Sequence, residues 1–167
     1  RQMCIRDRII QGKEEYDTLP GSYDDNGEVE QLVIYLKDRN YNLTLELHYY
    51  VYEKCDIITR SAKLVNSGNE SVRLERLMSM QLDLNESDYE LSFFNGAWAR
   101  EMNRSRIPIR AGKYVNESVT GTSSNRANPF FMIGRSSTTE DYGECYGFNL
   151  IYSGNHYEAA QVNSYGK

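Results

Sequence analysis

The sequence predicts an all-β protein built as an antiparallel sandwich of two sheets. Short runs with apolar residues at every second position recur along the chain, and clusters of turn-forming residues separate them at short, regular intervals. Tyrosine is unusually frequent, with 14 residues in 167, and aromatic residues favour strands. A helical period of 3.6 residues nowhere persists over about ten residues. We therefore expect about nine or ten strands and no domain boundary inside the chain.

Composition and charge narrow the function classes. Hydrophobic residues make up 40% of the chain and charged residues 26%, as in ordinary globular domains with a core. The net charge is −5, and the isoelectric point is about 5.1. This acidic balance argues against nucleic acid as a partner, because phosphate binding needs a basic face. A membrane is not an expected partner either, since no apolar run approaches the roughly 18 residues of a spanning helix.

The three cysteines predict neither a metal site nor a disulfide framework. Cys4, Cys55 and Cys145 match no zinc-binding spacing, and His48 and His156 do not complete one. No metal and no cofactor is expected. An odd number of cysteines favours reduced thiols and hence a cytoplasmic location. Five Asn-X-Ser/Thr sequons are the contrary signal, but the motif is short and the chain is rich in Asn and Ser.

Both ends of the sequence are predicted to be cut. Residues 1–8 include the run Met3 to Arg8, which resembles a translated sequencing-adapter remnant. They are predicted to be a non-native head and are excluded from the fold prediction, and residues 9–167 are assigned to one β-sandwich domain. The head lacks the apolar core and cleavage site of a signal peptide. Because Lys167 comes directly after a strand-like run, the sandwich is expected to be truncated at both ends.

The first predicted elements are a loop and two strands. Residues 19–27 are dense in Pro, Gly, Asp and Asn, which form turns. Residues 31–37 alternate and predict a short strand. Residues 43–51 carry apolar side chains at every odd position, so the odd side chains are predicted to face the core and the even ones a wetter side. His48 lies on the even side and is predicted to be a surface or interface histidine.

A long β-hairpin is predicted next. Residues 56–65 have strand character, and residues 71–84 alternate again, with Arg76 interrupting their apolar face. The four residues 66–69, Asn-Ser-Gly-Asn, are of the types that turns prefer. Two such runs joined by a short turn indicate that residues 56–65 pair with residues 71–84.

Five further runs have strand character in the second half: residues 89–94, 107–115, 130–133, 143–152 and 157–163. Pro108 indicates an edge strand or a strand start, because proline has no N–H to donate to the ladder. Residues 120–129 form a polar loop before the third run.

The stretch from Phe93 to Glu101 holds the single tryptophan, Trp98, between Gly96 and the pair Arg100 and Glu101. The sequence favours an aromatic anchor in a sheet core beside a solvated Arg–Glu pair, because tryptophan is usually buried. The alternative is a ring that faces a sugar or an interface, since an indole offers a flat apolar face and one N–H donor.

Recognisable catalytic motifs are absent from the sequence. It has no Gly-X-Ser-X-Gly elbow, phosphate-binding loop, dinucleotide fingerprint or His-Glu-X-X-His pair. The chain has 24 acidic residues, but a glycosidase needs two carboxylates at a defined separation, which sequence does not reveal. The residues alone therefore predict a soluble β-sandwich without an assigned activity.

An ordered set of motifs adds a family resemblance. In chain order the motifs are Leu19-Pro20, Asp56-Ile57-Ile58-Thr59-Arg60, Asn66-Ser67-Gly68, Gly96-Ala97-Trp98-Ala99-Arg100-Glu101, Gly121-Thr122-Ser123-Ser124, Asn128-Pro129-Phe130, Gly143-Glu144-Xaa-Tyr146-Gly147 and Tyr152-Ser153-Gly154-Asn155. No single motif is diagnostic. Their succession, over about residues 9–167, resembles the N-terminal β-sandwich domain of the α-galactosidases of glycoside hydrolase family 36.

The resemblance implies the function of a larger enzyme. Such enzymes hydrolyse terminal non-reducing α-galactosides, as in melibiose and raffinose-type sugars, with retention, and their two catalytic aspartates lie on a (β/α)8 barrel. It implies that this segment carries no catalytic residue and is inactive alone. The implied partners are its own catalytic barrel, the galactoside substrate through that barrel, and further copies in a homo-oligomer.

Five residues are candidates for contact with the barrel or for a position near the substrate: Trp98, Arg100, Glu101, Ser153 and Asn155. Arg100 and Glu101 are candidates for an interdomain or intersubunit polar contact, and a pair that fixes the turn within the sandwich is the equal alternative. Trp98 is a candidate for stacking on galactose, because aromatic faces suit sugar C–H surfaces.

Two other function classes stay open. A stand-alone carbohydrate-binding sandwich without catalysis would use the many tyrosines as binding aromatics, expose several on one face and end in a linker. The sequence shows no Pro/Ser-rich linker at its end, which favours the first interpretation. The second class is the sandwich of another barrel-bearing glycosidase with a different sugar specificity.

Overall fold

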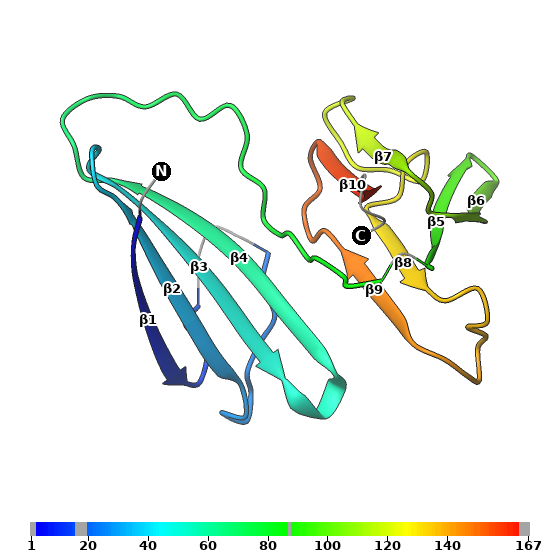
Figure 1. Cartoon of the computed structure of the whole chain (residues 1–167), viewed down its shortest axis with the longest axis horizontal. Helices are drawn as coiled ribbons and strands as arrows, with labels where there is room; N and C mark the ends of the chain where they lie inside the picture. Colours follow the sequence, from blue (N-terminus) through cyan, green and yellow to red (C-terminus); the bar gives the residue numbers. More distant parts are fainter. Residues whose placement is uncertain (1–2, 16–19, 87, 164–167) are drawn as a thin grey trace. The chain divides into compact units, whose positions relative to one another are not determined.

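The computed structural model describes residues 3–15, 20–86 and 88–163. Within these ranges the chain forms ten strands, one 3-10 turn at Glu53–Cys55 and no α-helix. The strand pairs in every sheet are antiparallel, which confirms the predicted all-β class. The strands form three sheets, where two were predicted. The chain divides into two compact units, Arg1–Leu82 and Asp83–Lys167 (Figure 1).

Unit 1 is a four-stranded sheet in the order β1-β2-β3-β4. Its strands are β1 (Met3–Gln11), β2 (Glu30–Asp38), β3 (Leu43–Tyr52) and β4 (Ile57–Asn66). The strands predicted at residues 31–37 and 43–51 are confirmed as β2 and β3. The excluded residues 3–8 belong to β1, which pairs with β2 along its whole length, so leaving them out of the fold prediction missed this strand.

One side of this sheet is mainly apolar, with Asp7 and Arg60 as polar exceptions within it. Leu45 lies between Leu36 and Leu64, and Leu47 between Ile34 and Ala62. Ile5 and Ile9 of β1 and Ile58 of β4 continue this side and are exposed. We call this side the aliphatic face; its members are Ile5, Ile9, Leu32, Ile34, Leu36, Leu43, Leu45, Leu47, Tyr49, Val51, Ile58, Ala62 and Leu64.

The opposite side of the sheet is covered by residues 12–15 and 20–29, on either side of a gap in the described chain. Gly12 N–H donates to the Val29 carbonyl at 2.8 Å, and Glu14 N–H donates to the Gln31 side-chain oxygen at 3.0 Å. His48 is 2% exposed on this side. The prediction of a surface or interface histidine was therefore wrong, because alternation identified the two faces of β3 but not which face the chain would cover.

Unit 2 contains two sheets that pack face to face. A four-stranded sheet has the order β6-β5-β8-β9, and a two-stranded sheet pairs β10 with β7. The strands are β5 (Glu90–Ala97), β6 (Arg100–Pro108), β7 (Gly112–Ser118), β8 (Phe130–Gly134), β9 (Cys145–Asn149) and β10 (His156–Val162). The Phe93 ring lies 4.8 Å from the Tyr114 ring of the other sheet. Leu91 is 1% exposed between the sheets, so this unit encloses its own small core.

The predicted hairpin between residues 56–65 and 71–84 was wrong in its second half. β4 ends at Asn66, and residues 71–84 form no strand. Asn66 accepts a hydrogen bond from Gly68 N–H at 3.0 Å, and Ser67 N–H donates to the Asn42 carbonyl at 2.8 Å. These bonds tie the turn to the β2–β3 connection, so the chain does not fold back along the edge of β4.

Two boundaries in unit 2 also differ from the prediction. The predicted strand at residues 107–115 is two strands, because β6 ends at Pro108 and β7 begins at Gly112. Pro108 does lie on an edge strand, as proline's missing N–H requires. The run at residues 143–152 is strand only over Cys145–Asn149. Residues 20–27 of the predicted first loop form no strand, and Leu19 lies outside the described residues.

Candidate functional site

Three connections of unit 2 meet at one end of its two sheets. They are the tip of the β5–β6 hairpin, the β7–β8 connection (residues 119–129) and the β9–β10 connection (residues 150–155). The register requires this, because Phe130 opposite Asn149 and Ser118 opposite His156 place strand ends side by side. Phe93 opposite Phe131 brings the end of β5 to the same place. We call this region the loop end.

Trp98 forms the tip of the β5–β6 hairpin and is 92% exposed. The favoured prediction of a buried aromatic anchor was therefore wrong. The hairpin continues past the strands it pairs with, so the tip has no opposite sheet to pack on. Ala99 and Met102 have φ angles of 58° and 56°, which are unfavourable for residues with a side chain. Such local strain often accompanies functional loops.

The neighbours of Trp98 hold this tip in shape. A Cβ at Gly96 would lie 2.3 Å from the Arg100 carbonyl oxygen, so glycine is needed there. The Glu101 carboxylate accepts a hydrogen bond from Ala99 N–H at 2.9 Å. Glu101 therefore fixes the turn within the unit, which was one of the two predicted roles for the Arg100–Glu101 pair. The Arg100 side chain is exposed beside it.

The β7–β8 connection braces the hairpin. The Asn125 amide donates to the Ala97 carbonyl at 3.3 Å. Asn128 uses its backbone N–H to donate to the Phe94 carbonyl at 3.1 Å, and its side chain lies 3.2 Å from the Met102 sulfur. Sequence reasoning identified this stretch as a loop but missed its bracing role.

The β9–β10 connection is attached to the same loop. Asn155 accepts a hydrogen bond from Gly121 N–H at 2.6 Å, and Ser123 N–H donates to the Ser153 carbonyl at 2.9 Å. The structure therefore places the five candidate residues on the β5–β6 hairpin tip, the start of β6 and the β9–β10 connection, which meet at the loop end. Asn155 is engaged within the unit, whereas the Trp98 ring is available to a partner.

The loop end combines a rigid framework with exposed apolar side chains. The exposed ones are Trp98, Met102, Val119, Ile151 and Tyr152. Apolar side chains gathered in this way are typical of binding surfaces. Among the described residues, no group of three or more His, Cys, Asp or Glu side chains is placed to hold a metal ion.

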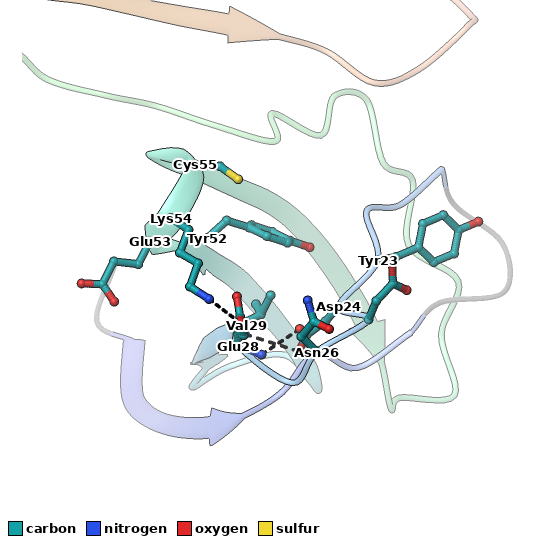
Figure 2. Close-up of a pocket in the computed structure, with 10 residues that line it drawn as sticks. Tyr23, Asp24, Asn26, Glu28, Val29, Tyr52, Glu53, Lys54 and Cys55 are labelled. Carbon is teal, nitrogen blue, oxygen red and sulfur yellow. Dashed lines mark hydrogen bonds and ion pairs between the residues drawn. The ribbon is translucent and has the colours of Figure 1, made fainter.

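Unit 1 contains a pocket of about 310 Å³ that sequence reasoning did not predict. It lies between residues 23–29 and the turn after β3 (Figure 2). Asp24 accepts hydrogen bonds from Glu28 N–H at 2.9 Å and from Val29 N–H, and Glu28 pairs with Lys54. These contacts hold one wall of the pocket to the other within unit 1.

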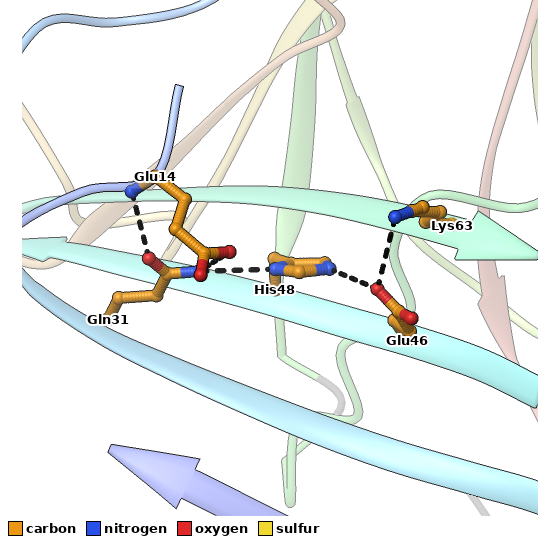
Figure 3. A network of polar contacts seen from close by, with 5 residues as sticks. All are labelled: Glu14, Gln31, Glu46, His48 and Lys63. Atoms are coloured by element: carbon orange, nitrogen blue, oxygen red, sulfur yellow. Dashed lines mark hydrogen bonds and ion pairs between the residues drawn. The ribbon is translucent and has the colours of Figure 1, made fainter. Parts of the chain in front are cut away.

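A chain of polar contacts runs beneath the covering segment of unit 1 (Figure 3). Gln31 lies 3.2 Å from His48 Nδ1 and 3.4 Å from a Glu14 oxygen. The other ring nitrogen of His48 lies 3.3 Å from Glu46, which also pairs with Lys63 at 3.6 Å. Because Gln31 and His48 are buried, this network satisfies polar groups in the interior and is not open to a substrate.

His156 is the second buried histidine. Neither ring nitrogen has a hydrogen-bond partner in the part of the chain that the structure describes, and the side chain lies on the inner side of the β10–β7 sheet beside Ser118. Burial lowers the pKa of His156 below its ordinary value of 6.5, because desolvation disfavours the charged ring. His156 is therefore a neutral core residue at neutral pH.

Two further features concern the cysteine side chains and the length of the helices. Cys4, Cys55 and Cys145 are free thiols, and all three are exposed. No helix in the described residues is long and apolar enough to cross a membrane.

Comparisons with known proteins identify relatives of this chain. Residues 2–167 match the glycosyl hydrolase family 36 N-terminal domain. The chain is 39% identical over 160 residues to α-galactosidase AgaA of Geobacillus stearothermophilus, covering 95% of this chain and 22% of that protein. It is 35% identical over 159 residues to α-galactosidase 2 of Hypocrea jecorina, covering 95% of this chain and 21% of that protein.

Solved structures of α-galactosidases are also similar to this chain. The crystal structure of AgaA matches with a TM-score of 0.93 at 37% identity, covering 99% of this chain and 24% of that one. The α-galactosidase from Lactobacillus brevis matches with a TM-score of 0.94 at 37% identity, covering 99% and 23%. Variants of AgaA have been solved in complex with raffinose and with stachyose.

The related full-length proteins are α-galactosidases, and this chain spans about a fifth of the length of the curated relatives it matches. What it shares with them is the N-terminal domain, over nearly its whole length. The chain therefore belongs to the glycosyl hydrolase family 36 N-terminal domain family.

Proposed function

We propose that the chain is the non-catalytic N-terminal domain of a retaining α-galactosidase that acts on terminal α-galactosides of the melibiose and raffinose type. The observation that carries this proposal is the 39% identity to an α-galactosidase over 95% of the chain.

In this proposal the loop end is the surface that contacts the catalytic barrel. It is rigid, because hydrogen bonds join the hairpin tip to residues 121–128 and these to residues 153–155. It also presents apolar side chains that a partner domain would bury. Trp98 would provide the largest contact, either against the barrel or beside the bound galactoside, and Arg100 would add a polar contact.

The test compares the isolated chain with the full-length protein on a chromogenic α-galactoside. The 167-residue chain is expected to show no turnover, and the full-length protein is expected to hydrolyse the substrate. Measurable turnover by the purified chain would overturn the proposal, and so would an inactive but folded full-length protein.

A matched pair of variants tests the role of the loop end in the full-length protein. Trp98→Ala is expected to lower kcat/KM, because the exposed indole is lost from the contact surface. Tyr142→Ala removes another exposed aromatic, 75% exposed, from the β8–β9 connection at the other end of the sheet, and is expected to leave kcat/KM unchanged. Equal effects from both variants would remove the loop end from the proposal.

A carbohydrate-binding module is the second candidate function. The two exposed aromatics at the loop end, Trp98 and Tyr152, favour it, because sugar-binding surfaces use aromatic faces. Calorimetric titration of the 167-residue chain with raffinose decides between the two. Saturable binding that Trp98→Ala abolishes would support the module, and no binding supports the scaffold domain.

The proposal extends to assembly and location. We propose a homo-oligomer, as the family resemblance implies, and a cytoplasmic location, which the three free thiols support. Light scattering of the full-length protein tests the first, and fractionation of the native cells tests the second.

A further inference from the structure

Residues 71–84 have the side-chain pattern of a strand but pair with no strand in the described part of the chain. Their apolar side chains occupy alternate positions, so in extended backbone they point to one side. These side chains are those of Val72, Leu74, Met78, Met80 and Leu82, and each is 40–52% exposed. Five such residues, interrupted on the same side by Arg76, form an apolar stripe that soluble proteins rarely leave open.

The opposite side of the same segment is polar. Arg73 and Glu75 lie there as a solvated ion pair, with 4.0 Å between Arg73 Nε and a Glu75 oxygen. Ser79 follows on this side, and Leu77 is its apolar exception. The segment therefore has one side suited to a protein surface and one suited to water, as in a strand on the outside of a sandwich.

The neighbouring sheet of unit 1 gives a second, independent sign that this unit is incomplete. Its aliphatic face spans all four strands, and Ile5, Ile9 and Ile58 on it remain exposed. The other side of the sheet is covered by residues 12–15 and 20–29. A sheet covered on one side by its own chain and mainly apolar on the other suits a partner that buries this face, and a second sheet packed face to face is one such partner.

We propose that residues 71–84 form a β-strand in the longer polypeptide, paired with a strand that lies outside these 167 residues. This inference rests on the proposed function, in which the chain is one domain of a larger enzyme. The length of the relatives supports this occupant: the chain covers 22% of AgaA, so most of such a polypeptide lies outside the region described here. In strand addition, main-chain hydrogen bonds supply affinity, and alternate side chains fill pockets.

Limited trypsin digestion tests the inference, because Arg73 and Arg76 are cleavage sites within the segment. In the isolated 167-residue chain both sites are expected to be cut early. In the full-length protein they are expected to be cut at least about tenfold more slowly, since cleavage follows the population of the open segment. Mass spectrometry of the fragments identifies the sites.

Two adjacent variants separate strand pairing from simple shielding. Met78 and Leu77 are 49% and 46% exposed in this structure. In the proposed strand, as adjacent residues, they would point to opposite sides. Met78→Asp in the full-length protein is expected to restore rapid cleavage and lower Tm, because a charge would enter the apolar contact. Leu77→Asp is the matched control and is expected to leave both unchanged. Equal responses of the two variants would overturn the inference.

Two further outcomes would also overturn it. Slow cleavage in an isolated chain that is monomeric by light scattering would mean that the segment is paired within these 167 residues. Slow cleavage in an isolated chain that is dimeric would make a second copy the partner. None of these readouts uses catalysis, so an inactive full-length protein with a protected segment would contradict the proposed function and leave this inference standing.

Discussion

The two units of the chain differ in how the faces of their sheets are covered. In unit 2 the four-stranded sheet packs against the β10–β7 pair, and Leu91 and the Phe93–Tyr114 contact lie between them. In unit 1 a single sheet is covered on one side by residues 12–15 and 20–29, while its aliphatic face has no sheet of the described part of its own unit against it. The comparison indicates that unit 2 encloses its own core, whereas unit 1 leaves one face of its sheet without a covering sheet of its own.

The largest expected effect concerns the core of unit 2. Leu91→Ala should lower the free energy of unfolding of this unit by about 2–5 kcal/mol, because a buried leucine leaves a cavity between the sheets. Leu74→Ala makes the same chemical change in the exposed segment of unit 1 and should cost less than about 0.5 kcal/mol in the isolated chain. Urea titration followed by NMR measures both. Equal costs would contradict the self-contained core.

The next effect concerns the buried network of unit 1. Gln31→Leu should cost about 1–3 kcal/mol, because the Glu14 N–H and the His48 ring would lose a buried partner. Gln161→Leu makes the same change at an exposed position of β10 and should be nearly neutral. The same urea titration reports both variants. A neutral Gln31→Leu would mean that the covering segment is not held by this network.

The pH dependence of unit 2 should reveal His156. Its pKa is lowered in the folded state, so the unfolded state binds more protons as the pH falls below 6.5. The contribution of His156 to the free energy of unfolding is therefore fully present above pH 6.5 and is lost as the pH falls through the folded-state pKa. His156→Phe should remove this loss.

Glu158 lies on the same inner side and shifts in the opposite direction. Burial raises the pKa of Glu158 above its ordinary 4.5, and the opposing effect of the hydrogen bond from Asn116 is smaller. The contribution of Glu158 to the free energy of unfolding is therefore lost as the pH rises. Comparing His156→Phe with the unmodified chain at each pH isolates the histidine. Parallel stability–pH curves for the two proteins would show that His156 does not titrate as described.

The smallest expected effect on stability is that of Trp98→Ala. The ring is 92% exposed, so unfolding of the isolated chain should change by less than about 0.5 kcal/mol. A much larger cost, measured by urea titration, would show that the ring packs within unit 2. The contrast with the expected loss of kcat/KM in the full-length protein is what separates a binding residue from a core residue.

The sequence predicted the positions of strands better than it predicted which strands pair with one another. Alternation located β2 and β3 correctly, because a two-residue period is a local property of the chain. The same alternation suggested that residues 71–84 would pair with β4, and they do not. A pattern specifies that a segment suits a sheet, whereas its partner depends on contacts remote in sequence.

Burial was the other quantity that local patterns could not supply. His48 and Trp98 were assigned to the wrong environments for the same reason. Residues 12–15 and 20–29 cover the side of the sheet that holds His48, and the length of the β5–β6 hairpin carries Trp98 beyond the sheet. Alternation gave the opposite expectation for His48, and residue type gave it for Trp98. The motif that contains Trp98 nevertheless carried the family resemblance, which the comparisons confirm.

Residue-resolved hydrogen exchange of the 167-residue chain tests the contrast between the two units most directly. The account predicts that amides of β5 and β8 exchange only through global opening of unit 2, and that amides of β2 and β3 exchange through an opening of clearly lower free energy. Equal protection of the two sets, lost together in one cooperative step, would contradict the claim that unit 2 is self-contained and unit 1 is not.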